Sequence, residues 1–338
     1  MSETKAANPG LLMQVALAHR SSAVLFAATE LDLFSAMGGG PRSAEELAAA
    51  CGAKPEPTRF LLDACVTVGL VEREDGRYTN SPTSAMFLVR GTPAYIGDGM
   101  KYAEDLYPAW GQLAELARTG RPVMPPETIL GDDPEKTRAF VLAMHERAKG
   151  IGAVLPHGAD LTGRTHLIDI GGGPGTYSVG LVRQTPGLRS TVLDRPGVLA
   201  VTKELVAEQG FSDRIDLRPA DYLADDFGSG YDCALLSGMM HRETIADCQL
   251  LLRKAFAALD PGGMVMVSDV FFDSDAKVSP PFATFFALNM MLTAEHGTCH
   301  ASTEMAAWMK TAGFVDIIIK PLPPPNPHTL LFGTKPKS

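Results

Sequence analysis

The stretch Leu167–Leu181, LIDIGGGPGTYSVGL, places three consecutive glycines, a proline and a fourth glycine directly behind a short apolar run. This pattern predicts a strand, a turn where the backbone lies close to a ligand, and then a helix. The spacing does not match Gly-x-Gly-x-x-Gly, because Thr176 stands where the third glycine is required, and no Gly-Lys-Ser/Thr follows. Asp169 would repel a pyrophosphate and attract an ammonium group, so we expect a ligand that is cationic at that end.

From residue 165 onward, apolar runs typical of strands alternate with helical periodicity. The expected strands are 165–171, 188–194, 214–222, 231–240 and 262–271, and the expected helices are 176–186, 197–210, 243–260 and 302–314. This alternation predicts a doubly wound parallel sheet with helices on both faces. The last two apolar runs, 315–322 and 328–335, are separated only by PPPNP, so we expect an antiparallel hairpin at one sheet edge.

The amino-terminal part has a different pattern. Helical periodicity over 11–34, a capped helix over 43–52, and a helix followed by two short strand-like runs over 55–82 predict a winged helix. Its third helix carries Arg59 beside Glu56 and Asp63, so it lacks a basic face for DNA, and we expect dimerisation instead. Two further helical stretches, 94–120 and 133–156, are joined by the proline-rich link 121–134.

Composition bounds the function. A chain of 338 residues predicts two domains, which we place at 1–98 and 99–338, with a helical linker or lid over 99–160. The net charge of −9 argues against a nucleic-acid partner and favours a small molecule. We expect no membrane span, no signal peptide and a cytoplasmic location, because no apolar run approaches ~20 residues. The five cysteines include no Cys-x-x-Cys pair, so we expect neither disulfides nor a zinc site.

Further acids follow the expected strands. Asp194 ends the second strand, where a carboxylate accepts hydrogen bonds from ribose hydroxyls, and Asp221 with Tyr222 follows the third, beside the expected place of an adenine. Together with Asp169 at the ammonium end, they fit a ligand that has an amino-acid end, a ribose and an adenine. This ligand is S-adenosylmethionine.

On these motifs the chain resembles the class I S-adenosylmethionine-dependent methyltransferases, specifically the two-domain small-molecule O-methyltransferases of plants and bacteria. The resemblance rests on LIDIGGGPGTYSVGLVRQTPGLRSTVLDRPGVL, on ADY at 220–222 and on AALDPGGMVMVSDVFF at 257–272. It implies an α/β fold, with a Rossmann-like seven-stranded sheet behind an N-terminal winged-helix dimerisation domain. It also implies a homodimer, S-adenosylmethionine as cofactor with S-adenosylhomocysteine as product, and no metal. The cofactor residues it implies are Asp169, Gly171, Gly172, Gly173, Asp194, Asp221, Tyr222 and Ser237.

The resemblance also places the catalytic groups. His241 follows the fourth strand where the family carries its general base, and a helix start there would keep its ring neutral. Asp269 matches the acid that holds this histidine. Arg242 and Glu243 replace the family's Asp and Trp, and Cys299 stands where a second acid is expected. These departures suggest an acceptor that is not a flat phenol.

Two methyl-transfer reactions remain open. One is O-methylation of a small hydroxylated metabolite with His241 as base. The other is S-methylation of a thioether acid, as in the related enzymes that methylate methylthiohydroxybutyrate towards dimethylsulfoniopropionate; it needs no base, and Arg147 or Arg242 would bind the carboxylate. A winged-helix ligand-binding regulator is the non-enzyme alternative, but it requires a basic surface. The expected acceptor-binding residues are Met144, His145, Arg147, Met240, Arg242, Phe286, Asn289 and Met290.

Overall fold

The computed structural model describes residues 7–124 and 133–337. The chain divides into two compact units, Met1–Tyr107 and Pro108–Ser338, so the division lies inside helix α7 (Gly97–Trp110). The boundary expected at residue 98 falls at the start of this helix. Most of the proline-rich link, residues 125–132, lies outside the described residues, and so does that part of the expected lid.

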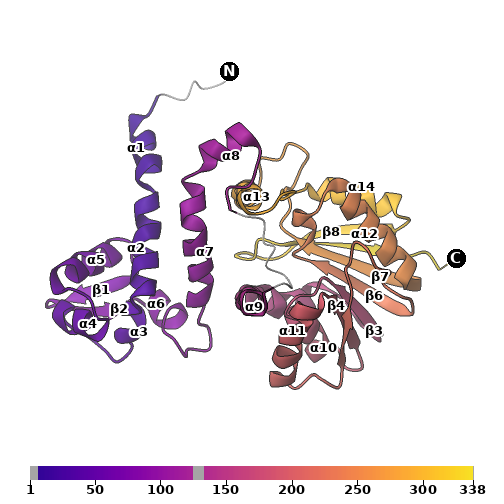
Figure 1. Ribbon diagram of the computed structural model, residues 1–338, viewed down its shortest axis with the longest axis horizontal. Coiled ribbons are helices and arrows are strands. Elements are labelled where there is room, and N and C mark those ends of the chain that lie inside the picture. The colour runs from indigo at the N-terminus through magenta and orange to yellow at the C-terminus, as the bar shows by residue number, and fades with distance from the viewer. Residues whose placement is uncertain (1–6, 125–132, 338) are drawn as a thin grey trace. The chain divides into compact units, whose positions relative to one another are not determined.

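The first unit consists of helices around a small hairpin (Figure 1). The expected helix 11–34 is divided into α1, α2 and α3; Asp32, at the last break, has a φ of 53°, which a right-handed helix cannot continue. Phe34, Leu47, Leu62 and Tyr78 form its core. The elements are α1 (Pro9–Leu17), α2 (His19–Glu30), α3 (Leu33–Ala36), α4 (Ala44–Ala50), α5 (Pro55–Thr67), β1 (Val71–Glu74), β2 (Arg77–Asn80) and α6 (Pro82–Phe87).

Helix α1 is apolar and almost entirely uncovered in the single chain. Leu11, Leu12, Met13 and Val15 are between 55% and 71% exposed. The stretch Pro9–Glu30 is long and apolar enough to cross a membrane, so the expectation that no run approaches that length was wrong. Length and composition alone are weak evidence for a span, because signal sequences and core helices share both. An exposed apolar surface of this kind is typical of a contact site.

The second unit is built on a seven-stranded sheet in the order β5-β4-β3-β6-β7-β9-β8. Strands β5 to β7 pair in parallel, whereas β9 is antiparallel to both β7 and β8. This confirms the doubly wound sheet and the hairpin at its edge. The strands are β3 (His166–Ile170), β4 (Arg189–Asp194), β5 (Ile215–Pro219), β6 (Tyr231–Ser237), β7 (Leu259–Asp269), β8 (Val315–Pro321) and β9 (Thr329–Thr334).

Helices cover both faces of this sheet, as Figure 1 shows for α10 and α11 on one face and α12 and α14 on the other. Leu167 of β3 packs in a cluster with α10, and its neighbour Ile168 packs in a cluster with α12, because side chains alternate between the faces of a strand. The helices are α8 (Leu113–Thr119), α9 (Pro134–Gly158), α10 (Thr176–Gln184), α11 (Pro196–Glu208), α12 (Ile245–Ala258), α13 (Pro281–Thr293) and α14 (Ser302–Thr311).

Asp232 joins the amino ends of β3 and β6. Its carboxylate accepts hydrogen bonds from Thr165 N at 2.7 Å, Thr165 Oγ1 at 2.9 Å and His166 N at 3.0 Å. We expect Asp232→Ala to lower the free energy of unfolding by about 2–3 kcal/mol, because three charge-assisted bonds are lost together. Calorimetric melting measures this loss. Asp216→Ala, which removes only an exposed ion pair with Arg189, is the control that should change little, and equal melting of all three proteins would contradict the prediction.

Candidate active site

The loop Gly171–Gly175 joins β3 to α10, and its glycines are required by its conformation. Gly171, Gly173 and Gly175 have φ values of 63°, 53° and 72°, which side chains rarely permit. Gly172 is excluded from substitution for a different reason: an added Cβ would lie 2.7 Å from Asp169 Cγ and 2.9 Å from Val192 Cγ1. The loop therefore lies directly on the Asp169 side chain.

Asp169 is fully buried, and only one of its two carboxylate oxygens has a hydrogen-bond partner among the described residues. Its Oδ2 accepts a hydrogen bond of 2.6 Å from Ser178 Oγ, whereas its Oδ1 has no partner among the described residues. Burial, reinforced by the nearby charge of Asp194, raises the pKa of Asp169 to about 6. An unsatisfied buried carboxylate oxygen is costly, and a cationic donor would satisfy it.

Asp194, the last residue of β4, fixes the loop to the neighbouring strand. Its Oδ2 accepts from Gly173 N at 2.8 Å and its Oδ1 from Arg195 N at 2.7 Å, while burial raises its pKa. A carboxylate has about four acceptor positions, so each oxygen can still accept from a hydroxyl.

The next two predicted cofactor residues lie differently. Asp221 is exposed, and its Oδ1 accepts from Leu223 N at 2.9 Å within a turn. The Tyr222 ring lies against the glycine loop, 3.5 Å from where a Cβ on Gly171 would stand, and its hydroxyl donates to Glu243 Oε1 at 2.7 Å. The Tyr222–Glu243 contact had no sequence signal.

His241 and Asp269 lie together at the end of the central strands. His241 stands in a short 3-10 turn, η1 (Met240–Arg242), and its Nδ1 lies 2.7 Å from Asp269 Oδ1. Asp269, the last residue of β7, is 1% exposed, and its oxygens also accept from Val270 N at 2.8 Å and His241 N at 3.3 Å. Burial opposes its ionisation, but the charge that His241 carries when protonated, together with its hydrogen bonds, lowers the pKa of Asp269 below its ordinary value.

This pairing fixes the tautomer of the neutral ring. An ionised carboxylate only accepts, so Nδ1 of His241 carries a proton, and in the neutral ring the lone pair is therefore on Nε2. The expected helix start has no part in this, because α12 begins at Ile245 and is capped by Thr244. Asp269, not a helix N-terminus, is the group that orients the ring.

Two further groups lie around Asp269. Cys299 Sγ donates to Val270 O at 3.1 Å, and burial raises its pKa to about 12, so the thiol cannot replace the second acid of the family. His328, which the sequence analysis missed, shares a 3.0 Å hydrogen bond with Ser268 Oγ. Burial lowers the pKa of His328 to about 4, so this second imidazole is neutral.

An aromatic wall stands beside His241. The Phe286 ring lies edge-on to the imidazole, with centroids 4.9 Å apart at 82°, and Phe282 stacks on Phe286 with centroids 6.1 Å apart. Asn289, one turn further along α13, has a buried side-chain oxygen without a partner among the described residues. Phe286 therefore provides a flat apolar surface beside the imidazole, and Asn289 provides a buried oxygen that can still accept a hydrogen bond.

Three other predicted acceptor residues are buried or paired with another side chain. Met240 is fully buried in the core with Cys248, so its side chain exposes no surface to an acceptor. Met290 is 4% exposed. The ring of His145 contacts Thr176 Oγ1 at 2.8 Å, where α10 begins, and therefore supports the glycine loop. Periodicity cannot separate buried methionines from pocket-lining ones.

The remaining predicted residues differ in their exposure. Arg147 is exposed on α9, with Nη1 4.0 Å from Met144 Sδ, and Arg242 is half-buried in η1. Ser237 ends β6 and is 7% exposed.

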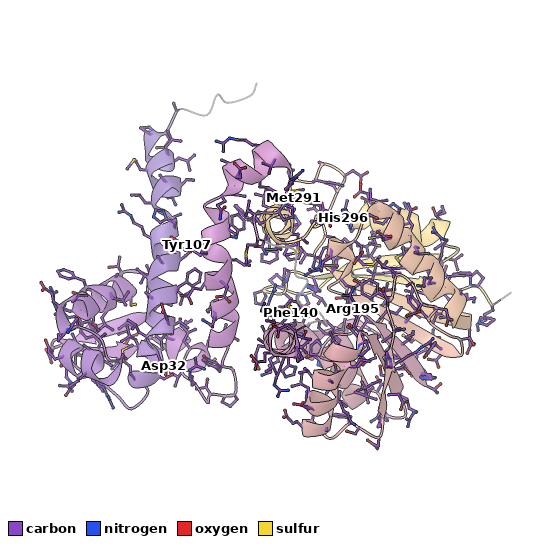
Figure 2. All side chains as sticks on the ribbon, in the orientation of Figure 1. Asp32, Tyr107, Phe140, Arg195, Met291 and His296 are labelled. Atoms are coloured by element: carbon purple, nitrogen blue, oxygen red, sulfur yellow. The ribbon has the colours of Figure 1, made fainter. Side chains whose placement is uncertain are left out.

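A cavity of about 610 Å³, which His241 does not line, lies between α8 and α13. Figure 2 shows Met291 and His296, two of its lining residues, near each other on this side. Within residues 7–124 and 133–337, no group of three or more His, Cys, Asp or Glu side chains is arranged to hold a metal ion.

Comparisons with known proteins decide the family. Residues 116–315 match the O-methyltransferase domain, and residues 13–90 match the O-methyltransferase dimerisation domain. The chain belongs to the S-adenosylmethionine-dependent O-methyltransferases. It is therefore a methyltransferase enzyme, and the resemblance seen in its sequence is confirmed.

Several relatives match this methyltransferase over almost its whole length. It is 32% identical to the 3-hydroxy-5-methyl-1-naphthoate 3-O-methyltransferase of Streptomyces sahachiroi, covering 97% of this chain and 95% of the relative. It is also 32% identical to the tetracenomycin polyketide synthesis 8-O-methyl transferase of Streptomyces glaucescens, covering 99% of each. Human N-acetylserotonin methyltransferase, solved with S-adenosylmethionine, is 26% identical with a TM-score of 0.86, covering 99% of this chain and all of that one.

The residues at the sheet edge fit the cofactor of this family. The free Oδ1 of Asp169 suits the ammonium group, and the loop over it has no room for a Cβ at Gly172. S-adenosylmethionine is thus the cofactor, and S-adenosylhomocysteine is the product that it leaves.

Proposed function

We propose that this methyltransferase methylates a hydroxyl of an aromatic small molecule, with His241 as the general base and Asp269 orienting it. The observation that carries the proposal is the 2.7 Å contact between His241 Nδ1 and Asp269 Oδ1, which leaves Nε2 able to accept a proton. This chemistry uses the buried charge of Asp269, which a reaction without proton transfer would not require.

The acceptor class follows from the wall beside the base. Phe286 stands edge-on to His241 and would pack against the face of a planar ring, while Asn289 offers its unpaired oxygen to a polar substituent. One relative is named for a hydroxynaphthoate and another for a polyketide, and both are O-methyltransferases. These observations favour an aromatic hydroxyl over the non-phenolic acceptor that the altered residues Arg242 and Glu243 suggested.

For the cofactor, Asp169 would hold the ammonium group, Asp194 the ribose hydroxyls, and Tyr222 the adenine side of the site. S-adenosylmethionine supplies a methyl group on a positively charged sulfur. The glycine loop lets the cofactor lie close to the backbone without a side chain between them. Asp221 has its side chain turned to Leu223 N, so its part in binding is smaller than we expected.

In the proposed mechanism His241 removes the proton that would otherwise remain on the acceptor oxygen. Nε2 accepts this proton as the oxygen becomes nucleophilic, and the ring then carries a positive charge. Asp269 is buried and ionised, so it stabilises that charge and prevents the ring from rotating. Phe286 restricts water on one side of the imidazole.

The thioether alternative has less support. Neither of the two Streptomyces relatives is named for a sulfur acceptor. A general base held by a carboxylate, as His241 is held by Asp269, serves no purpose in methylating a thioether. Arg147 is exposed and Arg242 is half-buried, and either would bind a carboxylate of either acceptor type.

We also propose that the enzyme is a homodimer in which the apolar surface of α1 is covered by a second copy. The match of residues 13–90 to a dimerisation domain supports this, and so does the exposure of Leu11, Leu12, Met13 and Val15.

Cofactor affinity should depend on pH through Asp169. Because the pKa of Asp169 is about 6 in the free enzyme, its carboxyl group is protonated below that pH. It must then lose a proton before it can bind an ammonium group, and this lowers the affinity. We expect calorimetric affinity for S-adenosylhomocysteine to be flat above pH 7 and to fall about tenfold per unit below pH 6. Asp169→Asn should weaken binding and flatten the profile, whereas Asp194→Asn should weaken binding and retain the fall. Unchanged affinity and profile in Asp169→Asn would refute the assignment.

The acceptor and the role of His241 are tested together. Labelled S-adenosylmethionine is first assayed against hydroxynaphthoates, simple phenols, hydroxy acids and thioether acids, and we expect methylation of the hydroxynaphthoates or phenols. On that acceptor, His241→Ala should lower kcat by roughly 10²- to 10⁴-fold with little change in cofactor affinity, whereas His296→Ala on an exposed loop should not. The wild-type rate should also fall in acid as the base is protonated. Nearly full kcat in His241→Ala would show that another group, or none, takes the proton.

Light scattering should give about 72 kDa for the intact protein, twice the 36.0 kDa of one chain. Leu12→Glu should shift it towards the monomer, because a charge would be buried at the interface, whereas Val278→Glu, equally exposed in the second unit, should not. A monomeric wild type that floats with lipid vesicles would instead assign α1 to a membrane surface.

A further inference from the structure

A segment distant in sequence crosses the turn that carries His241. Thr298 N donates to His241 O at 2.9 Å, and His300 Nε2 lies 3.2 Å from Met240 O. Two consecutive carbonyls of η1 are therefore held by the segment before α14. No feature of the sequence connected His300 with the base.

The same segment is bound to the strand that carries Asp269. Phe272, three residues beyond Asp269, donates from its N to His300 O at 2.9 Å, and Ser302 N donates back to Phe272 O at 2.9 Å. Phe272 and Ala301 pair as a parallel bridge. His300 thus lies on the segment paired with the extension of β7, and its side chain contacts η1. It therefore connects the two elements whose spacing sets the contact between His241 and Asp269.

One peptide unit is held at both ends by this arrangement. The carbonyl of Met240 and the N–H of His241 belong to the same planar group and point in opposite directions. His300 Nε2 binds the oxygen at 3.2 Å, and Asp269 Oδ2 accepts from the nitrogen at 3.3 Å. Because the unit is rigid, a rotation at the carbonyl would also move the N–H away from Asp269.

His300 is suited to be a permanent donor. It is 3% exposed, and its ring lies edge-on to Trp308 with centroids 5.0 Å apart. A carbonyl only accepts, so the 3.2 Å contact with Met240 O assigns the proton to Nε2, which Cys248 Sγ also approaches at 3.6 Å. Burial, which outweighs the attraction of Asp269 and Glu304, lowers the pKa of His300, and the ring therefore remains neutral.

The other donors to the Met240 carbonyl cannot replace it. Cys248 Sγ lies 3.4 Å away, but a thiol is a weak donor. Glu243 N, at 3.3 Å, closes the turn locally and does not connect it to β7.

We propose that His300 is a positioning residue that orients the Met240–His241 peptide and thereby sets the contact between His241 and Asp269. This inference rests on the proposed function of His241 only for its effect on rate, since the geometry of the contact is a separate observable.

Three substitutions test the proposal. His300→Leu removes the donor, His300→Gln keeps an amide N–H at the reach of Nε2, and His300→Asn has the same amide one bond too short. His296→Leu, on an exposed part of the same loop, is the control. The readouts are kcat and KM on the acceptor, calorimetric affinity for S-adenosylhomocysteine, melting temperature, and the downfield NMR signal of the Nδ1 proton shared by His241 and Asp269.

We expect His300→Leu and His300→Asn to lower kcat by about 10- to 30-fold and to shift or broaden the signal, with cofactor affinity within about twofold of the wild type. His300→Gln should restore both. Because Gln and Asn differ only in reach, their comparison remains decisive if the Leu variant does not fold. A moved signal with unchanged kcat would support the positioning role and refute His241 as base. If the signal and kcat stay at wild-type values while only the melting temperature falls, His300 merely fills the core and the proposal is wrong.

Discussion

The candidate active site depends on one constraint of the parallel sheet: the strands β3, β4, β6 and β7 all end on the same side of it. Asp169, Asp194 and Asp269 are each the last or next-to-last residue of a strand, so the sheet gathers three carboxylates that are far apart in sequence. All three are buried, and a buried charge is costly without partners. What surrounds each carboxylate therefore decides what it does.

The surroundings separate the three acids. Asp169 has one hydroxyl partner and an unpaired oxygen, and its pKa is raised to about 6, whereas Asp269 has His241 and two backbone donors, and its pKa is lowered. A carboxylate that is destabilised in the free enzyme gains most from a cationic ligand. One that is already paired holds its charge constant and stabilises a protonated neighbour. The same side chain thus suits the cofactor on one strand and the base on another.

Local patterns predicted most of the second unit. Alternating apolar runs gave the strands, and PPPNP gave the terminal hairpin, because so short a connection cannot join parallel strands. The helix predicted over 11–34 is divided into three, and its last break lies at Asp32, which takes a left-handed conformation that periodicity does not reveal. The sequence also did not reveal that Met240 is buried in the core or that His145 contacts Thr176, because helical or strand position says which face a residue occupies, but not what lies opposite.

The sequence by itself determined the glycine loop, the acids at the strand ends and the family, because these depend on local backbone preferences and on the order of elements along the chain. Only the tertiary structure decided that Glu243 meets Tyr222, that His328 stands beside Ser268, and that His300 holds the peptide before His241. These contacts join residues separated by whole strands or helices. Their formation depends on strand register and on the path of each connecting loop in space. A hydrogen bond requires atoms within about 3 Å, and no pattern of residue types along a chain specifies distance to that precision.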